Sequence, residues 1–382
     1  MTNSDNQGLN TKCVHAGTFI DESIKGVNTP IFTSSSFLVD YDAELKPLYP
    51  RALNTPNHKA VAQKIAALEK GKYAYVVSSG MAAISNVLLA CLKPGDHVLF
   101  QRQIYGGTHS FINHILSDMQ VEVDWIYEFN NVSLGKLLKP NTKLIYIETP
   151  SNPLLKIVDL SFVASFAKMN NLISVIDNTF ATPINQTPLC FGIDVVVHSG
   201  SKYFGGHSDM ICGAIATNCE KLSHAIFRYI NSLGPVLDAN TCYLLERSLK
   251  TLALRMEKIN SNALKIAEFL ETNSKITKVN YPGLKSFAGH DIAARQMKKF
   301  GGMMSFEVKG KAEDVVTKLK VVASALSLGG VESICSIPRA TSHSTISAEE
   351  RKESGISDSL IRFSTGIEDI EDLIADLEQA LN

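Results

Sequence analysis

An α/β fold is predicted for this sequence, with a mostly parallel seven-stranded sheet covered by helices and a smaller C-terminal α+β domain. Two observations predict it. Short runs of β-branched and apolar residues alternate with segments of helical periodicity from about residue 55 to residue 253. Several runs also end in a polar residue, as in Val175-Ile176-Asp177, and ligands of parallel sheets bind at the carboxyl ends of the strands. A chain of 382 residues is long enough for two cores.

The first two thirds of the chain divide into an arm and a large domain. Residues 1–54 are rich in Thr, Ser and Asn and show little periodicity, which predicts an extended N-terminal arm that gains order on a neighbouring subunit. Residues 55–253 are expected to form the large domain. A helix rich in Ala and Leu is expected at 81–92, after the first strand. The expected strands are 73–77, 97–101, 121–125, 143–148, 173–177, 194–198 and 211–217.

Residues 254–382 are expected to form the smaller C-terminal α+β domain. A helix-rich stretch from 237 to 273 leads into it. Strands are then expected at 278–281, 302–308 and 360–364, with helices at 312–320 and 368–381. The charged stretch at 342–357 is typical of a solvated loop or a short helix.

The composition disfavours several kinds of function. A formal net charge of −1 gives no electrostatic reason to expect binding to nucleic acid or an anionic membrane. Residues 1–7 are polar, unlike a signal peptide, and no apolar run approaches the roughly 20 residues of a membrane span. Seven scattered cysteines without a CxxC pair are typical of the reducing cytoplasm, so we expect a cytoplasmic protein. His198 and His207 lack further ligands at suitable spacing, so no metal is expected.

Lys202 lies just after the apolar run at 194–197, next to small hydroxyl residues in the segment His198-Ser199-Gly200-Ser201. A lysine at the end of a buried strand is well placed to be a desolvated amine with a lowered pKa. Such an amine can form a Schiff base with an aldehyde cofactor, most commonly pyridoxal 5′-phosphate (PLP). The alternative is a surface lysine with a buried stem and a solvated ammonium.

An anion site is predicted where the strand at 73–77 runs through Ser78-Ser79-Gly80-Met81 into a helix. The start of a helix presents free N–H groups and the positive end of its dipole, which favour an anion such as phosphate. The segment lacks the GxGxxG and GxxxxGK[ST] spacings, so a dinucleotide fold and a P-loop are disfavoured. An ordinary serine cap on a structural helix is the alternative.

Two further charged residues complete the pattern. Asp177 ends a β-branched strand, where a buried carboxylate could keep a pyridinium nitrogen protonated. Its alternative role is to cap the following turn. Arg362 lies on a short late strand, and its guanidinium can bind the carboxylate of an amino acid through two parallel hydrogen bonds. A surface ion pair is the alternative for this residue.

Together these segments resemble the Cys/Met-metabolism family of PLP enzymes, which includes cystathionine γ-synthase, cystathionine β- and γ-lyases, methionine γ-lyase and the homoserine-ester sulfhydrylases. The resemblance runs nearly end to end, from TKCVHAG at 11–17 to the C-terminal helix. It implies fold type I of the PLP-dependent transferases, the fold of aspartate aminotransferase, with PLP as the cofactor. It also implies a homotetramer, built as a dimer of dimers that share their active sites.

The resemblance also implies a role for each site residue. Lys202 would be the internal aldimine and would move protons between substrate carbons. The cofactor-binding residues would be Asp177 at the ring nitrogen, Tyr105 stacked on the ring and aiding proton removal, Gly80, Met81, Ser199 and Ser201 at the phosphate, and Tyr49 and Arg51 at the phosphate of the neighbouring subunit. The substrate-binding residues would be Arg362, Asn152, Ser327 and Leu328.

Three positions depart from the family pattern, and a fourth, Gly107, distinguishes between its members. Pro50 and Ser201 stand where relatives usually have serine and threonine, and Gly107 is typical of cystathionine enzymes, whereas methionine γ-lyases carry cysteine. Leu326 replaces the glutamate that usually precedes Ser-Leu-Gly in cystathionine γ-synthases and γ-lyases. Leucine cannot bind the distal ammonium of cystathionine, and an unpaired ammonium would cost about 1–3 kcal/mol.

We therefore expect a PLP-dependent lyase or transferase of transsulfuration, within methionine and cysteine metabolism, that breaks or exchanges the C–S bond of cystathionine-type substrates. Methionine γ-lyase, cystathionine β-lyase and O-acetylhomoserine sulfhydrylase are alternatives with the same chemistry. A non-catalytic binding protein with the same fold is the alternative from a different class.

Overall fold

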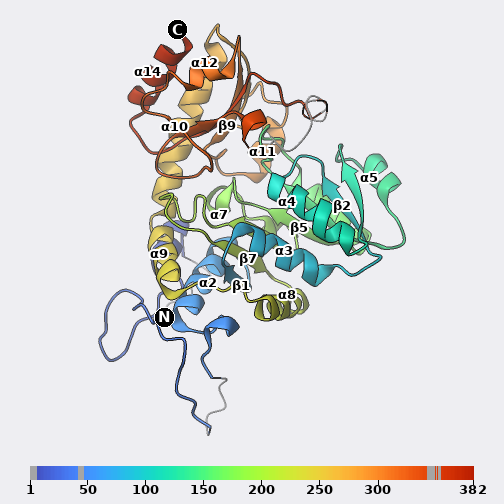
Figure 1. The fold of residues 1–382 in the computed structure, drawn as a ribbon, viewed down its shortest axis with the longest axis vertical. Helices are drawn as coiled ribbons and strands as arrows, with labels where there is room; N and C mark the ends of the chain where they lie inside the picture. Colours follow the sequence, from blue (N-terminus) through green and yellow to red (C-terminus); the bar gives the residue numbers. More distant parts are fainter. Residues whose placement is uncertain (1–6, 42–46, 342–348, 350, 352–353) are drawn as a thin grey trace.

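The computed structural model describes residues 7–41, 47–341, 349, 351 and 354–382. In this part of the chain two sheets are stacked along the long axis of the molecule (Figure 1). The larger has seven strands in the order β1-β7-β6-β5-β4-β2-β3, and the smaller has five in the order β10-β11-β12-β9-β8. The predicted fold class is confirmed. No helix among the described residues is long and apolar enough to cross a membrane.

The larger sheet is parallel from β6 to β3, and β7 runs antiparallel to both of its neighbours. Its central strands are buried over nearly their whole length, because helices cover both faces. This is why they read as continuous apolar runs in the sequence. The strands are β1 (Tyr73–Val77), β2 (His97–Gln101), β3 (Glu122–Ile126), β4 (Thr142–Glu148), β5 (Ile173–Asp177), β6 (Val195–Ser199) and β7 (Gly213–Thr217).

The helices around the larger sheet form two layers. One face packs on α3 and α8 through residues such as Val87 and Ile226, and the other packs on α6 through Val163 and Phe166. The helices of this part are α1 (Leu9–His15), α2 (Pro56–Glu69), α3 (Gly80–Cys91), α4 (Gly106–Phe111), α5 (Asn131–Leu137), α6 (Leu160–Met169), α7 (Thr182–Asn185), α8 (Glu220–Leu233) and α9 (Ala239–Leu249), with the short helices η2 (Pro50–Ala52), η3 (Ile112–Leu116) and η4 (Pro188–Phe191).

The smaller sheet buries one face against α10 and α14, around Phe306 and Phe363. The first turns of α10 belong to the core of the large sheet and its last turns to this second core, so one long helix joins the two (Figure 1). The elements are α10 (Leu252–Thr272), β8 (Ile276–Asn280), α11 (His290–Gln296), β9 (Met303–Val308), α12 (Ala312–Val316), β10 (Ala323–Ser324), β11 (Ile334–Ser336), β12 (Leu360–Ser364) and α14 (Ile370–Leu381).

The structure departs from the sequence-based expectations in three places. The N-terminal arm is not wholly extended, because α1 packs on α2 with Cys13 buried and the buried Lys64 amine donating to the Cys13 carbonyl at 3.0 Å. The helix expected at 312–320 ends at Val316, whereas the helix-rich stretch expected at 237–273 is present as α9 and α10. Strands β10 and β11 were not expected. Most of the loop expected at 342–357 lies outside the described residues.

Asp376 is expected to make a pH-dependent contribution to stability. This buried residue of α14 accepts hydrogen bonds from the backbone N–H groups of Lys320, Val321 and Val322 at 2.8–2.9 Å. Burial raises the pKa of its carboxyl group, but the three backbone N–H donors and the Gln379 side-chain amide together outweigh burial, and the net pKa is lowered. A lowered pKa means that the stabilisation is present above the unfolded-state pKa and is lost as pH falls through the folded-state pKa.

Replacing Asp376 with alanine should therefore lower the free energy of unfolding by about 2–3 kcal/mol at pH 7. Urea unfolding at pH 7 and at pH 3 measures the difference, which should shrink at the lower pH. The control is Asp372→Ala, which removes an exposed carboxylate of the same helix and should cost less than about 1 kcal/mol. An equal loss for both variants at pH 7 would contradict the prediction.

Candidate active site

Three neighbouring strands of the larger sheet end at the same edge, each with a polar residue: Glu148 on β4, Asp177 on β5 and Ser199 on β6. The parallel register places Glu148 beside Asp177. Both side chains are buried, with exposed fractions of 4% and 7%. Burial raises the pKa of both carboxyl groups, and the neighbouring Asp177 charge raises that of Glu148 further. A positively charged group at this edge would be strongly stabilised.

Lys202 lies in the turn that follows β6, and its amine donates to the Ser327 hydroxyl at 2.5 Å. Burial lowers the pKa of the Lys202 amine, and the positive charge of Arg362 lowers it further, while Asp177 acts in the opposite direction. Ser327 has a φ of +83°, a conformation that costs a non-glycine residue roughly 1 kcal/mol. The turn thus holds an amine with a lowered pKa near a buried acid.

Arg362 reaches the same edge from β12 of the smaller sheet. It is buried, and its two terminal nitrogens donate to the Asn152 side-chain oxygen and to the Ser327 carbonyl, both at 3.2 Å. Burial lowers the pKa of the Arg362 guanidinium to about 10, so it stays charged at neutral pH. Leu328, next to Ser327, is also buried. The structure therefore brings Lys202, Ser327, Arg362 and Asn152 together.

The start of α3 lies against the end of β6. Ser79 caps the helix by accepting a hydrogen bond from the Ala82 N–H at 3.0 Å, and the N–H groups of Gly80 and Met81 have no acceptor within the helix. A Cβ atom on Gly80 would lie 2.7 Å from the Ser199 Cβ. Only glycine allows this close approach, which creates a small cradle of N–H groups beside a serine side chain.

Tyr105 lies at the start of α4, where its backbone N–H donates to a Glu148 carboxylate oxygen at 2.8 Å. Its ring is 46% exposed. A Cβ atom on Gly107 would lie 2.5 Å from the Tyr105 ring and 2.9 Å from the Met81 sulfur. With the ring in this position, the chain has no room for a side chain at residue 107.

Three of the residues predicted for the cofactor site make other contacts. The Ser201 hydroxyl accepts from the Cys212 N–H at 3.0 Å and donates to the Cys212 carbonyl at 3.3 Å. Arg51 donates to the Asn231 carbonyl of α8 at 2.8 Å, and its guanidinium lies 5.3 Å from the centre of the Tyr49 ring. Within this chain, therefore, Tyr49 and Arg51 do not contact Lys202, Ser327, Arg362 or Asn152.

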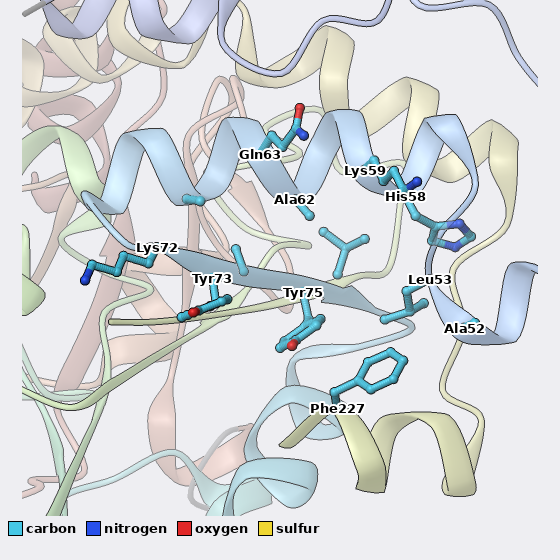
Figure 2. Close-up of a pocket in the computed structure, with 13 residues that line it drawn as sticks. Ala52, Leu53, His58, Lys59, Ala62, Gln63, Lys72, Tyr73, Tyr75 and Phe227 are labelled. Atoms are coloured by element: carbon cyan, nitrogen blue, oxygen red, sulfur yellow. The ribbon is translucent and has the colours of Figure 1, made fainter. Parts of the chain in front are cut away.

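A surface groove of about 230 Å³ lies beside these two residues, between α2, β1 and α8 (Figure 2). Leu53, Tyr75 and Phe227 face one another in it, and the polar side chains of His58, Lys59, Gln63 and Lys72 also line it. None of the predicted site residues lines it. The chemistry predicted from the sequence is therefore not located in this groove.

Sequence reasoning missed two buried groups at the site. Glu148 ends a β-branched strand as Asp177 does, and that shared position was a signal that could have identified it. The second is Glu69, whose carboxylate lies 2.5 Å from the His198 imidazole, with both side chains buried. No group of three or more His, Cys, Asp or Glu side chains suited to a metal occurs within the described residues.

An amine and carboxylates in this arrangement suit one class of protein, the PLP-dependent enzymes of fold type I, and comparison with known proteins agrees. Over residues 10–382 the sequence matches the family of Cys/Met metabolism PLP-dependent enzymes, and the chain belongs to that family.

Individual relatives are similar over nearly their whole length. The chain is 41% identical to cystathionine beta-lyase of Lactococcus lactis subsp. cremoris and 42% identical to L-methionine gamma-lyase of Fusobacterium nucleatum subsp. polymorphum, covering 98% of both chains in each case. It is also similar to the solved structure of cystathionine gamma-lyase from Lactobacillus plantarum complexed with L-serine, with a TM-score of 0.95, 37% identity and 98% of each chain covered. The predictions of family, enzyme class and PLP cofactor are confirmed: the chain is a PLP-dependent enzyme of the carbon–sulfur lyases and synthases.

The residues present fit this cofactor. The glycine cradle at Gly80 offers free N–H groups to a phosphate. A nearby positive charge would stabilise the buried Asp177 carboxylate, and a protonated ring nitrogen would supply it. One Asp177 oxygen accepts from the Thr179 N–H at 2.9 Å, which holds the carboxylate in place.

Proposed function

We propose that this enzyme breaks the carbon–sulfur bond of cystathionine-type amino acids, with Lys202 as the residue that moves protons. The observation that carries the proposal is the unbroken set of contacts from the Lys202 amine through Ser327 to Arg362 and Asn152. It puts a base with a lowered pKa beside a buried guanidinium suited to an α-carboxylate. A proton at the α-carbon of a bound amino acid would then lie within reach of Lys202.

The cofactor-binding roles follow the same geometry. We infer that Asp177 pairs with the ring nitrogen, that the N–H groups of Gly80 and Met81 bind the phosphate together with Ser199 and Ser201, and that Tyr105 stacks on the ring. When bound, PLP supplies stabilisation of negative charge at the α-carbon.

The substrate would be held by its carboxylate. Arg362 would bind that group with the Ser327–Leu328 backbone, and Asn152 would orient it. Lys202 would then take the α-proton, and it could deliver a proton to, or remove one from, the neighbouring carbon. Burial of Arg362 and Asp177 excludes water, which strengthens each of these electrostatic contacts.

Leu326 favours a second candidate function, the cleavage of methionine or the sulfhydrylation of an O-acylhomoserine. Its side chain is apolar and 68% exposed, and it cannot pair with the distal ammonium of cystathionine. Substrates without a distal ammonium would lose no binding energy at this position, because they have no charge there to pair. The tight contact of Gly107 with Tyr105 points the other way, because it leaves no room for the cysteine of methionine γ-lyases.

We infer that the working unit is a homo-oligomer, a tetramer of site-sharing dimers. Residues 1–54 would be the arm that contacts a neighbour, 55–253 the PLP-binding domain and 254–382 the C-terminal domain. The part of the arm at residues 16–41 extends away from the rest of the chain (Figure 1) and exposes Ile24, Val27, Leu38 and Tyr41 almost fully, which suits burial against a second copy. Tyr49 and Arg51 lie near the end of this arm and would reach the neighbour's phosphate. The seven free thiols suit a cytoplasmic location.

The substrate is tested by supplying the purified enzyme with cystathionine, methionine, homocysteine, or O-acetylhomoserine plus sulfide, and identifying the keto acids and thiols by mass spectrometry. We expect turnover of cystathionine. Pyruvate as the product means β-elimination, and 2-oxobutyrate with cysteine means γ-elimination. Inertness toward cystathionine with rapid use of methionine or O-acetylhomoserine would reject the first candidate and support the second.

Leu326→Glu provides a matched comparison. If the distal ammonium of cystathionine lies near this position, the added carboxylate should lower KM for cystathionine by up to about fivefold, the worth of an exposed ion pair. The KM for methionine, which lacks this ammonium, should not fall.

A further inference from the structure

We propose that Glu148 is a positioning residue that holds both the tyrosine above the cofactor and the group that binds the substrate carboxylate. The inference rests on the proposed function of Tyr105, Asn152 and Arg362. Glu148 itself contacts neither cofactor nor substrate in the roles set out above. Its effect would be exerted through hydrogen bonds to the backbone.

The two carboxylate oxygens of Glu148 serve two different loops. One accepts from the Tyr105 N–H at 2.8 Å, and the other accepts from the Asn152 N–H at 3.0 Å. The first loop follows β2 and starts α4, while the second follows β4. A single carboxylate therefore fixes the distance between the backbone that carries the aromatic ring and the backbone that carries the substrate-facing amide.

The backbone of Glu148 is also fixed in place. The Glu148 backbone N–H donates to the Gln101 side-chain oxygen at 2.9 Å, and Gln101 is buried at the end of β2. The register of β4 and β5 sets Asp177 beside it. The charged or titratable groups that interact electrostatically with Glu148 include Asp177 from β5, Arg362 from β12 and Tyr146 from β4 itself. With the residue buried and both oxygens accepting hydrogen bonds, the carboxylate faces the protein interior.

A continuous set of contacts connects Glu148 to the reacting amine. The Asn152 side chain accepts from Arg362, Arg362 donates to the Ser327 carbonyl, and the Ser327 hydroxyl accepts from Lys202. Moving Asn152 would therefore also displace Arg362, which binds the substrate carboxylate, and Ser327, which orients Lys202. Residues in one such network act together.

The test is Glu148→Gln in the holoenzyme. Glutamine has nearly the same shape but only one acceptor oxygen, so either the Tyr105 or the Asn152 N–H loses its partner. We expect kcat to fall and KM to rise, with kcat/KM lower by roughly 10- to 100-fold, the effect of a displacement of about 1 Å at a site. The visible circular dichroism of the bound cofactor should also change, because the ring that stacks on it moves.

The matched control is Glu246→Gln, the same change at a buried glutamate of α9 that accepts from Thr18, outside the site. It should leave the cofactor spectrum and both kinetic constants unchanged. A folded Glu148→Gln enzyme with a wild-type spectrum, KM and kcat, each within about twofold, would overturn the proposal.

Hydrogen exchange of the wild-type holoenzyme tests the same contacts without a variant. The amide protons of Tyr105 and Asn152 should be protected, although both lie in loops. Exchange at the rate of exposed loop residues would show that Glu148 holds neither. The spectrum and the exchange are measured without substrate, so they test Glu148 even if the proposed substrate is wrong.

Discussion

Replacing Lys202 with alanine should lower kcat by about 10²- to 10⁴-fold or more, the contribution of a positioned proton-transfer group. The amine is buried enough to have a lowered pKa, and it lies at the edge of the sheet beside Asp177. We propose that the same amine forms the covalent carbon–nitrogen bond to PLP, so the variant should also lose the yellow colour of the wild-type enzyme. Absorbance spectra and steady-state kinetics measure both effects.

A mapping experiment gives an independent check. Wild-type enzyme treated with borohydride should bleach, and mass spectrometry should find the cofactor mass on the peptide that contains Lys202. Lys298→Ala, which removes an exposed lysine outside the site, is the control and should behave as wild type. A coloured Lys202→Ala protein with at least a tenth of the wild-type kcat would show that another residue binds PLP covalently and transfers the proton.

Replacing Arg362 with alanine should reduce kcat/KM by about 30- to 4,000-fold, equivalent to the roughly 2–5 kcal/mol lost when one partner of a buried charge pair is removed. The guanidinium is 5% exposed, so water cannot take its place easily. Arg362→Lys keeps the charge but loses the paired N–H donors, and its activity should lie between those of wild type and Arg362→Ala. Kinetics with an amino-acid substrate measure the order of the three proteins.

The control for this series is Arg295→Ala, which removes an arginine whose side chain is 64% exposed in a surface ion pair with Asp159. It should change kcat/KM by less than about fivefold. If Arg362→Ala behaves in the same way as this control, Arg362 does not bind the substrate carboxylate, and the assignment of the site must change.

The sequence predicted the seven strands of the large sheet to within about two residues, because each is a compact apolar run with polar residues at its ends. It did not predict β10 and β11, which have two and three residues. Strands this short carry no periodic signal and exist only because they pair with a neighbour. The sequence predicted a helix-rich stretch at 237–273 but not where α9 ends and α10 begins, since Lys250 and Thr251 are both compatible with a helix.

At the site, the residues whose chemistry is unusual for their position were predicted, and those that act by orientation were not. Lys202 and Asp177 follow apolar strands, so their burial could be expected from the pattern. Glu148 likewise ends a strand, β4. Its carboxylate, however, accepts hydrogen bonds from the N–H groups of two loops, and no local sequence pattern predicts those contacts. That Tyr49 and Arg51 bind the phosphate in a neighbouring subunit remains a prediction, because the contact would need a second copy of the chain.

The sequence by itself determined the class of fold, the cofactor chemistry and which side chains stand at the ends of the strands, because these depend on local apolar patterns and on residue type. Only the tertiary structure decided how those side chains meet. Ser327 lies 125 residues from Lys202, and Arg362 lies 210 residues from Asn152, yet each pair is within hydrogen-bond distance. Contacts over such separations are set by the packing of the two sheets around α10, which no local pattern in the chain specifies.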